Sequence, residues 1–296
     1  MVFALAIEQY KKNKELSSDE ISKLLEWIKQ QPHLPEVTEL EAILFLHSCY
    51  YSMQLAKQTV DTYFTMRTHV PELFSGINFE KEDLKTAMKI VSVFPNEKTT
   101  PEGHRIFFGK LANFDATHFH LPSCLKLFFT TFDLSLRENG TAPGHIIILD
   151  HSGVTLGHVA RLAPLVLKKF IYYLQDASPI RIVGFHFVNI VPFSDKILAL
   201  VRPFMKKELI DVLHLHNKLD GLDQFVPLEI LPTEYGGKEG PAEEMCARAY
   251  QNAIKNQNFF EDLEKRKVNE NVRPGKPKDA SDLFGIEGSF KQLSID

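Results

Sequence analysis

The chain has 296 residues, of which 44% are hydrophobic and 24% charged, a composition typical of a folded globular protein. Its formal net charge of −4 gives no reason to expect nucleic acid as a partner. The cysteines Cys49, Cys124 and Cys246 lie far apart and are odd in number, which argues against a disulfide framework. No apolar run approaches the ~20 residues that cross a bilayer. We therefore expect a cytoplasmic protein.

The first part of the chain has the spacing of a small helical module. Ser17 and Glu20 have the pattern of a capping box, and apolar residues at helical spacing follow them. Further helical patterns cover residues 38–47, 56–70 and 80–94. We predict an N-terminal helical module over residues 1–94.

Strand and helix patterns alternate in the next part of the chain. Apolar runs predict strands at residues 105–111, 145–150, 180–190 and 212–216. Helical patterns fall between them, which favours right-handed crossovers and an α/β fold with a largely parallel sheet. We predict that this domain covers residues 95–240. A helix at residues 241–268 and a flexible tail at residues 269–296 should follow it.

The aromatic composition is biased towards one residue type. The chain contains 23 Phe beside one Trp and 8 Tyr. Phe buries a large area and has no polar group that needs a partner. Two interpretations stay open at this level: a Phe-rich core, or an internal cavity with apolar walls.

Few residue patterns indicate catalysis or metal binding. The chain has no Gly-x-Gly-x-x-Gly, Walker or Gly-x-Ser-x-Gly sequence after a strand. Asp150, His151 and Ser152 follow a strand, but adjacent side chains point apart and do not form a relay. The pairs His118/His120 and His214/His216 have no third ligand nearby in the sequence. We expect no enzyme activity, no metal and no cofactor, with a hydrolase that uses residues 150–152 as a weaker alternative.

Four segments have the order and spacing of a known family. They are residues 45–74, residues 148–154 with Asp150 and Gly153, residues 181–204, and the sequence Ile230-Leu231-Pro232-Thr233-Glu234-Tyr235-Gly236-Gly237, which is the most specific. Together they resemble the CRAL-TRIO lipid-binding proteins, which include cellular retinaldehyde-binding protein and alpha-tocopherol transfer protein. The resemblance implies a helical module beside an α/β domain whose sheet forms the floor of a lipid pocket. It also implies a mobile amphipathic gate helix over the opening.

The resemblance places the pocket and the gate on particular residues. The gate is the stretch 192–205, whose apolar stripe also fits this role by its helical spacing: Phe193, Ile197, Leu200, Val201 and Phe204. The implied pocket walls are Phe129, Phe132, Ile148, Leu174, Ile180, Ile182 and Phe185.

Basic residues beside the gate predict transient contact with a membrane surface. Lys206 and Lys207 follow the apolar helix, a pattern that suits an anionic bilayer. Tocopherol transfer proteins read phosphoinositide headgroups with a basic patch. Of the four matching positions only Arg181 is basic here, and the others are Cys49, Glu208 and Val212.

The sequence therefore predicts a cytosolic protein that binds and transfers a small hydrophobic molecule in a gated apolar pocket. Retinoids, tocopherols, carotenoids and other isoprenoids or lipids are the candidate ligands. The alternative is a lipid-regulated interaction module in membrane trafficking or signalling.

Overall fold

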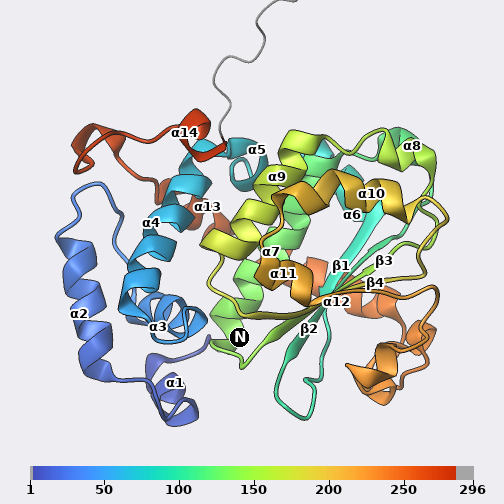
Figure 1. Cartoon of the computed structure of the whole chain (residues 1–296), viewed down its shortest axis with the longest axis horizontal. Helices are drawn as coiled ribbons and strands as arrows, with labels where there is room; N and C mark the ends of the chain where they lie inside the picture. The colour runs from blue at the N-terminus through green and yellow to red at the C-terminus, as the bar shows by residue number, and fades with distance from the viewer. Residues whose placement is uncertain (1–2, 285–296) are drawn as a thin grey trace, which may run out of the picture.

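The computed structural model describes residues 3–284, in which a helical module packs beside a sheet with helices on both faces (Figure 1). The module consists of α1 (Ala6–Lys12), α2 (Ser18–Lys29), α3 (Glu39–Ser48), α4 (Met53–His69), α5 (Pro71–Phe74) and α6 (Glu82–Ile90). The expected helical character of this part is confirmed. Ser17 precedes α2 but makes no capping bond through its side chain. The capping box lies instead at α3, where the Thr38 backbone N–H donates to Glu41 Oε2 at 2.8 Å.

The described residues form one five-stranded sheet in the order β1-β2-β3-β4-β5. The strands are β1 (Val91–Pro95), β2 (Arg105–Leu111), β3 (His145–Asp150), β4 (Ile182–Val188) and β5 (Leu213–Leu215). β1 pairs with β2 antiparallel, and the other neighbours are parallel, so the predicted largely parallel α/β fold is confirmed. The predicted helix at 80–94 ends at Ile90, because Val91 and Val93 are β-branched and pair with β2.

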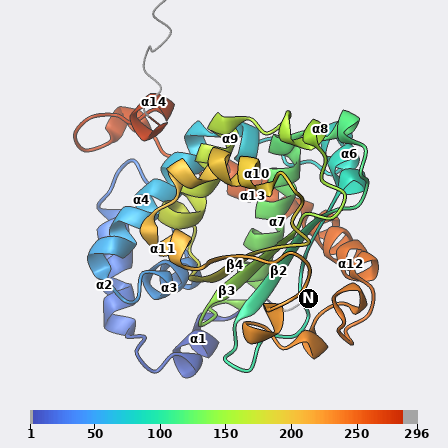
Figure 2. The same ribbon diagram turned by 45° about the vertical axis from the view of Figure 1, so that its right-hand side comes forward.

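Helices cover the two faces of the sheet separately. One face meets α7 (Leu121–Asn139), α9 (Pro164–Tyr172) and α10 (Ser194–Val201), with the short α8 (Leu156–Val159) at its end. The other face packs on α12 (Ala242–Lys255) and on apolar residues from Leu222 to Tyr235. Figure 2 shows α12 on the side of the sheet away from α9 and α10. The remaining helical segments are α11 (Lys207–Asp211), α13 (Gln257–Lys265), α14 (Ala280–Phe284), a π-helical turn at Tyr173–Ala177, and 3₁₀ turns at Ala116–His118, Arg202–Phe204, Leu222–Gln224, Leu228–Ile230, Thr233–Tyr235 and Glu270–Val272.

The C-terminal part differs from the expectation in two ways. The predicted helix at 241–268 breaks at Asn256 into α12 and α13. Residues 269–284 do not form a free tail but pack across the N-terminal helices and reach α9 (Figure 1). The guanidinium of Arg273 makes an ion pair with Asp61 at 2.6 Å, and Phe284 is 2% exposed. Residues 285–296 of the expected tail lie outside the described residues.

A buried ion pair joins the helical module to the α/β domain. Arg67 on α4 donates to both carboxylate oxygens of Asp133 on α7, at 2.8 and 3.2 Å, and to the hydroxyl of Tyr173 at 3.1 Å. Arg67 and Asp133 are 5% and 9% exposed, so water screens this pair little. The rings of Tyr63 and Phe74 lie against the guanidinium. The pair therefore fixes where the module sits against α7.

We predict that Arg67→Leu lowers the free energy of unfolding by about 3–5 kcal/mol, because it leaves the Asp133 carboxylate buried and unpaired. The double change Arg67→Leu with Asp133→Leu should recover most of this loss. Urea denaturation followed by circular dichroism measures both effects. Asp262→Asn, which breaks an exposed pair with Lys265, is the control and should leave the midpoint unchanged. Equal midpoints for Arg67→Leu and the wild type would contradict the argument.

Candidate functional site

A cavity of about 220 Å³ lies between one face of the sheet and helices α7, α9 and α10. Strands β3 and β4 supply Leu149, Phe185 and Phe187. These residues point to this face because side chains alternate along a strand. Gly109 on β2 belongs to the same surface, and a methyl group there would lie 2.8 Å from Leu149 Cδ2. A larger residue at 109 would therefore crowd the cavity floor.

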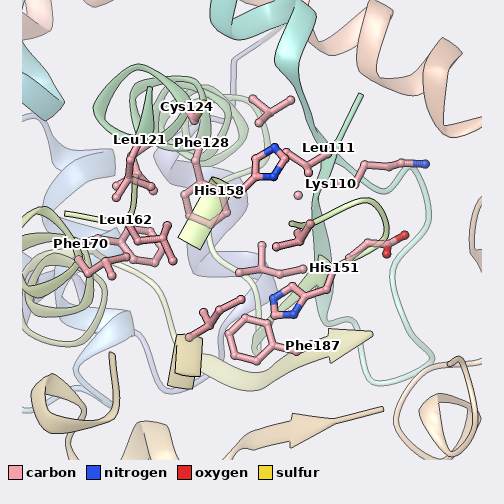
Figure 3. A pocket seen from close by; sticks show the side chains of 18 of the residues that line it. Lys110, Leu111, Leu121, Cys124, Phe128, His151, His158, Leu162, Phe170 and Phe187 are labelled. Atoms are coloured by element: carbon pink, nitrogen blue, oxygen red, sulfur yellow. The ribbon is translucent and has the colours of Figure 1, made fainter. Parts of the chain in front are cut away.

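Helices supply the other walls of the cavity. Helix α7 contributes residues at spacings of three and four, which lie on one helical face: Leu121, Cys124, Leu125 and Phe128. Helix α9 contributes Leu167, Phe170 and Ile171, and α10 contributes Ile197 and Val201. Figure 3 shows Leu121, Phe128, Leu162, Phe170 and Phe187 around the same space.

Only four of the 24 residues that line the cavity are charged or polar: Lys110, Asp150, His151 and His158. The Lys110 side chain extends away from the apolar side chains, and its ammonium lies over the Tyr235 ring (Figure 3). The Asp150 carboxylate accepts hydrogen bonds from Tyr235 Oη at 2.9 Å, Asn189 Nδ2 at 3.0 Å and the Ser152 backbone N–H at 2.8 Å. Neither charge is therefore free to meet a ligand, and the two imidazoles are the polar groups that remain.

The triad-like run at residues 150–152 forms no relay in the structure. His151 Nδ1 lies 3.2 Å from Ser194 Oγ, which also accepts a hydrogen bond from the Val191 backbone N–H. Asp150 is held by Tyr235 and Asn189 rather than by His151. Sequence neighbours therefore have different partners, as their opposed directions on the chain require.

Three of the twelve residues expected in the pocket and gate line this cavity: Phe185, Ile197 and Val201. The other nine lie outside it. Ile148 was expected on the cavity face, but it is buried with Ile146 and Phe108 on the opposite face of the sheet. Ile182 precedes an irregularity in the β3–β4 register and is half-buried beyond the cavity.

The remaining expected wall and gate residues pack elsewhere in the core. Four of them enclose a separate small void behind α7: Phe129, Phe132, Leu174 and Ile180. The others are half-buried around α10 and do not line the cavity: Phe193, Leu200 and Phe204. On α10, the buried apolar residues Ile197 and Val201 are four positions apart and line the cavity. The other three residues of the expected gate stripe do not line the cavity in this structure, and their role at the pocket stays a prediction.

The basic residues expected at a membrane or headgroup already have partners. Arg181 Nε donates to the backbone carbonyl of His47 at 2.8 Å, and its guanidinium lies over the rings of Tyr50 and Tyr51. Arg181 thus joins the helical module to the start of β4. Lys206 pairs with Asp176, and Lys207 pairs with Asp211, although both lysine side chains remain largely exposed.

The histidine pairs noted in the sequence separate into two situations. His118 is exposed, while His120 Nδ1 lies 2.8 Å from Ser123 Oγ. His214 and His216 stack against His186, and His216 Nε2 lies 3.0 Å from His186 Nδ1. Within residues 3–284 no group of three His, Cys, Asp or Glu side chains is arranged to hold a metal ion.

A second cavity of about 440 Å³ lies between the helical module and α13. Its walls include five charged side chains: Glu41, Asp133, Arg137, Asp262 and Arg266. An apolar molecule would leave these charges desolvated, which is costly. The cavity on the sheet is smaller but suits an apolar ligand better.

Comparison with known proteins identifies two segments of the chain. Residues 87–237 match the family model described as CRAL/TRIO domain, and residues 13–84 match the one described as Pinta-like, UBA domain. The chain is 29% identical over 217 residues to the alpha-tocopherol transfer protein-like protein of Mus musculus, covering 72% of this chain and 62% of the relative. It is 29% identical over 183 residues to clavesin-2 of Homo sapiens, covering 60% of this chain and 55% of the relative. The chain therefore spans less than two thirds of either relative. The crystal structure of Sfh5 aligns with a TM-score of 0.47 at 12% identity, over 88% of this chain and 100% of that one.

Between residues 3 and 284, no helix is both long enough and apolar enough to cross a bilayer.

Burial lowers the pKa of His151 to about 4, from an ordinary value of 6.5. The folded protein therefore stays neutral at this site while the unfolded chain takes up a proton between pH 6.5 and about 4. The stability that His151 contributes is fully present above pH 6.5 and is lost as the pH falls through that window.

We predict that His151→Gln reduces the loss of unfolding free energy between pH 7 and pH 4 by roughly 3 kcal/mol. Urea denaturation at the two pH values measures it. His118→Gln, at an exposed position, is the control and should retain the wild-type pH dependence. The same pH dependence in His151→Gln and the wild type would show that the imidazole is not desolvated.

Proposed function

Because the chain belongs to the CRAL/TRIO domain family, we propose that it binds a small hydrophobic molecule in the cavity on the sheet and transfers it between membranes. A retinoid, tocopherol, carotenoid or other isoprenoid or lipid would fit this role. We propose the division expected from the sequence with its first boundary moved from residue 94 to residue 90, because β1 belongs to the sheet: a helical module at residues 1–90, a lipid-binding domain at residues 91–240 and a C-terminal helical segment at residues 241–268. The site of action would be the cytoplasm, with peripheral contact at membranes.

The observation that carries the proposal is the apolar lining of the cavity. Twenty of its 24 lining residues are apolar, and the two charged ones do not point a free charge into it. Each CH₂ group that leaves water gains ~0.8 kcal/mol, so a hydrocarbon ligand needs no polar contact to bind. A bilayer offers a similar gain, so pocket and membrane are nearly balanced. Exchange is then limited by how the cavity opens.

Helix α10 is the element that we propose as the gate. Ile197 and Val201 form its inner face, whereas Asp195, Lys196 and Ala199 are exposed on its outer face. The helix has only eight residues, and its movement would open the cavity without disturbing the sheet. Exposed basic residues lie on the gate or directly after it and suit an anionic surface: Lys196, Arg202, Lys206 and Lys207. Arg181 is occupied by the His47 carbonyl, so we assign it no headgroup role.

Hydrogen bonds from Gln175 hold the chain just after α10. Its side-chain amide donates to the Phe204 carbonyl and accepts from the Lys206 backbone N–H, each at 2.9 Å. The ammonium of Lys206 also pairs with Asp176 in the same π-helical turn. These contacts would keep the gate closed between transfer events.

Filling the cavity tests the site. Val159 lines it, whereas Leu156 on the same short helix is 56% exposed. We predict that Val159→Phe weakens binding of the apolar dye N-phenyl-1-naphthylamine by roughly tenfold or more, because the ring occupies ligand space. Leu156→Phe is the matched control and should bind as the wild type does. Dye fluorescence titration measures both, and equal affinities for the two variants would place the binding site elsewhere.

Loosening the gate tests the route of exchange. We predict that Gln175→Ala speeds dissociation of the same dye by roughly 3- to 30-fold and lowers the unfolding free energy by about 1–2 kcal/mol, because it removes two hydrogen bonds that hold the closed state. Stopped-flow dilution measures the rate. Gln251→Ala, at an exposed position on α12, is the control. An unchanged dissociation rate in Gln175→Ala would contradict gating by α10. Faster dye exchange without transfer of the dye from vesicle to vesicle would favour the alternative function, a lipid-regulated interaction module.

A further inference from the structure

The cavity contains two imidazole rings, those of His151 and His158, among mostly apolar walls (Figure 3). His158 is 3% exposed and His151 is 8% exposed. Polar groups buried in such surroundings cost free energy unless they find a partner. Their hydrogen bonds therefore indicate what they offer to a bound molecule.

The backbone fixes the tautomer of His158. Its Nδ1 lies 3.1 Å from the Thr155 backbone nitrogen, which can only donate, so Nδ1 accepts. The Thr155 hydroxyl lies 2.9 Å from the same nitrogen. A neutral imidazole that accepts at Nδ1 carries its proton on Nε2. His158 Nε2 is buried and has no hydrogen-bond partner among the described residues.

The tautomer of His151 is not fixed in this way. Ser194 Oγ accepts from the Val191 backbone N–H, but a hydroxyl oxygen has a second lone pair, so it can either donate to His151 Nδ1 at 3.2 Å or accept from it. His158 is therefore the ring whose backbone contact leaves an Nε2–H donor for a third party.

The charge of the two rings limits the kind of acceptor. Burial lowers the pKa of His151 to about 4, and burial together with Arg161 lowers the pKa of His158. Both rings are therefore neutral at physiological pH. The ammonium of Lys110 extends out of the cavity, and Asp150 adds a negative charge to its wall. A carboxylate would find no cation there, whereas an uncharged oxygen would find an N–H donor.

We propose that the ligand is an apolar molecule with an uncharged oxygen acceptor, such as a carbonyl, and that His158 Nε2–H donates a hydrogen bond to this oxygen. This inference rests on the proposed function, since it assigns the polar end of the molecule that the cavity binds. It makes His158 a residue that determines specificity without being needed for apolar binding as such.

The test compares three probes of one chain length: decane, 2-decanone and decanoic acid. Each displaces N-phenyl-1-naphthylamine from the full-length protein at neutral pH. His158→Leu removes the donor, while His158→Gln keeps an N–H near the position of Nε2. Leu162→Ala is the control, since it removes apolar wall without changing a polar group.

We expect His158→Leu to weaken 2-decanone by roughly 3- to 10-fold relative to decane, because one hydrogen bond is lost. His158→Gln should retain most of the preference, Leu162→Ala should weaken both probes equally, and decanoic acid should bind less tightly than 2-decanone. In the unaltered protein, ¹⁵N spectra of the imidazoles should show His158 protonated on Nε2, with a shift of this resonance on addition of 2-decanone but not of decane.

Three outcomes would overturn the inference. If His158→Leu leaves the ratio of 2-decanone to decane affinity unchanged, His158 Nε2–H does not bind the ligand oxygen. The proposed function then stands without this hydrogen bond. If the spectra show the proton on Nδ1, the tautomer argument is wrong whether or not the variants fold. If neither decane nor 2-decanone displaces the dye from the wild type, the proposed function fails as well.

Discussion

The alternation of side chains along the parallel strands is the constraint on which the rest of the structure depends. On β3 and β4 it directs Leu149, Phe185 and Phe187 to the helices α7, α9 and α10. The intervening Ile148 faces α12 and the segment that follows β5. One face thus becomes a closely packed core and the other the floor of a cavity. A slip by one residue would exchange the two faces.

Two polar clusters keep the elements around the cavity in place. At the end of β3, Asp150 accepts hydrogen bonds from Tyr235 and Asn189, which fixes the Thr233–Tyr235 turn against the sheet. Behind α7, Arg67 pairs with Asp133 and docks the helical module. The most recognisable motif of the sequence, the run from Ile230 to Gly237, therefore supports the cavity from outside and does not line it.

Local patterns predicted the elements well, whereas the lining residues depended on tertiary geometry. The strands at 105–111 and 145–150 follow from apolar runs in the sequence. The choice between Phe128 and Phe129 as a wall residue depends on the rotation of α7 against the sheet, which no local pattern records. The packing of residues 269–284, the described part of the expected tail, could not be predicted, because Arg273 pairs with Asp61, which lies 212 positions away in the sequence. His158 could have been suspected as an isolated polar residue beside Val159 and Leu162.

The account predicts a molecule in the cavity of the native protein. The most direct measurement is native mass spectrometry of gently purified full-length protein, followed by organic extraction. We expect one apolar molecule per chain, and one with an uncharged oxygen if His158 acts as inferred. An empty protein that also takes up none of a panel of isoprenoids and lipids would contradict the account.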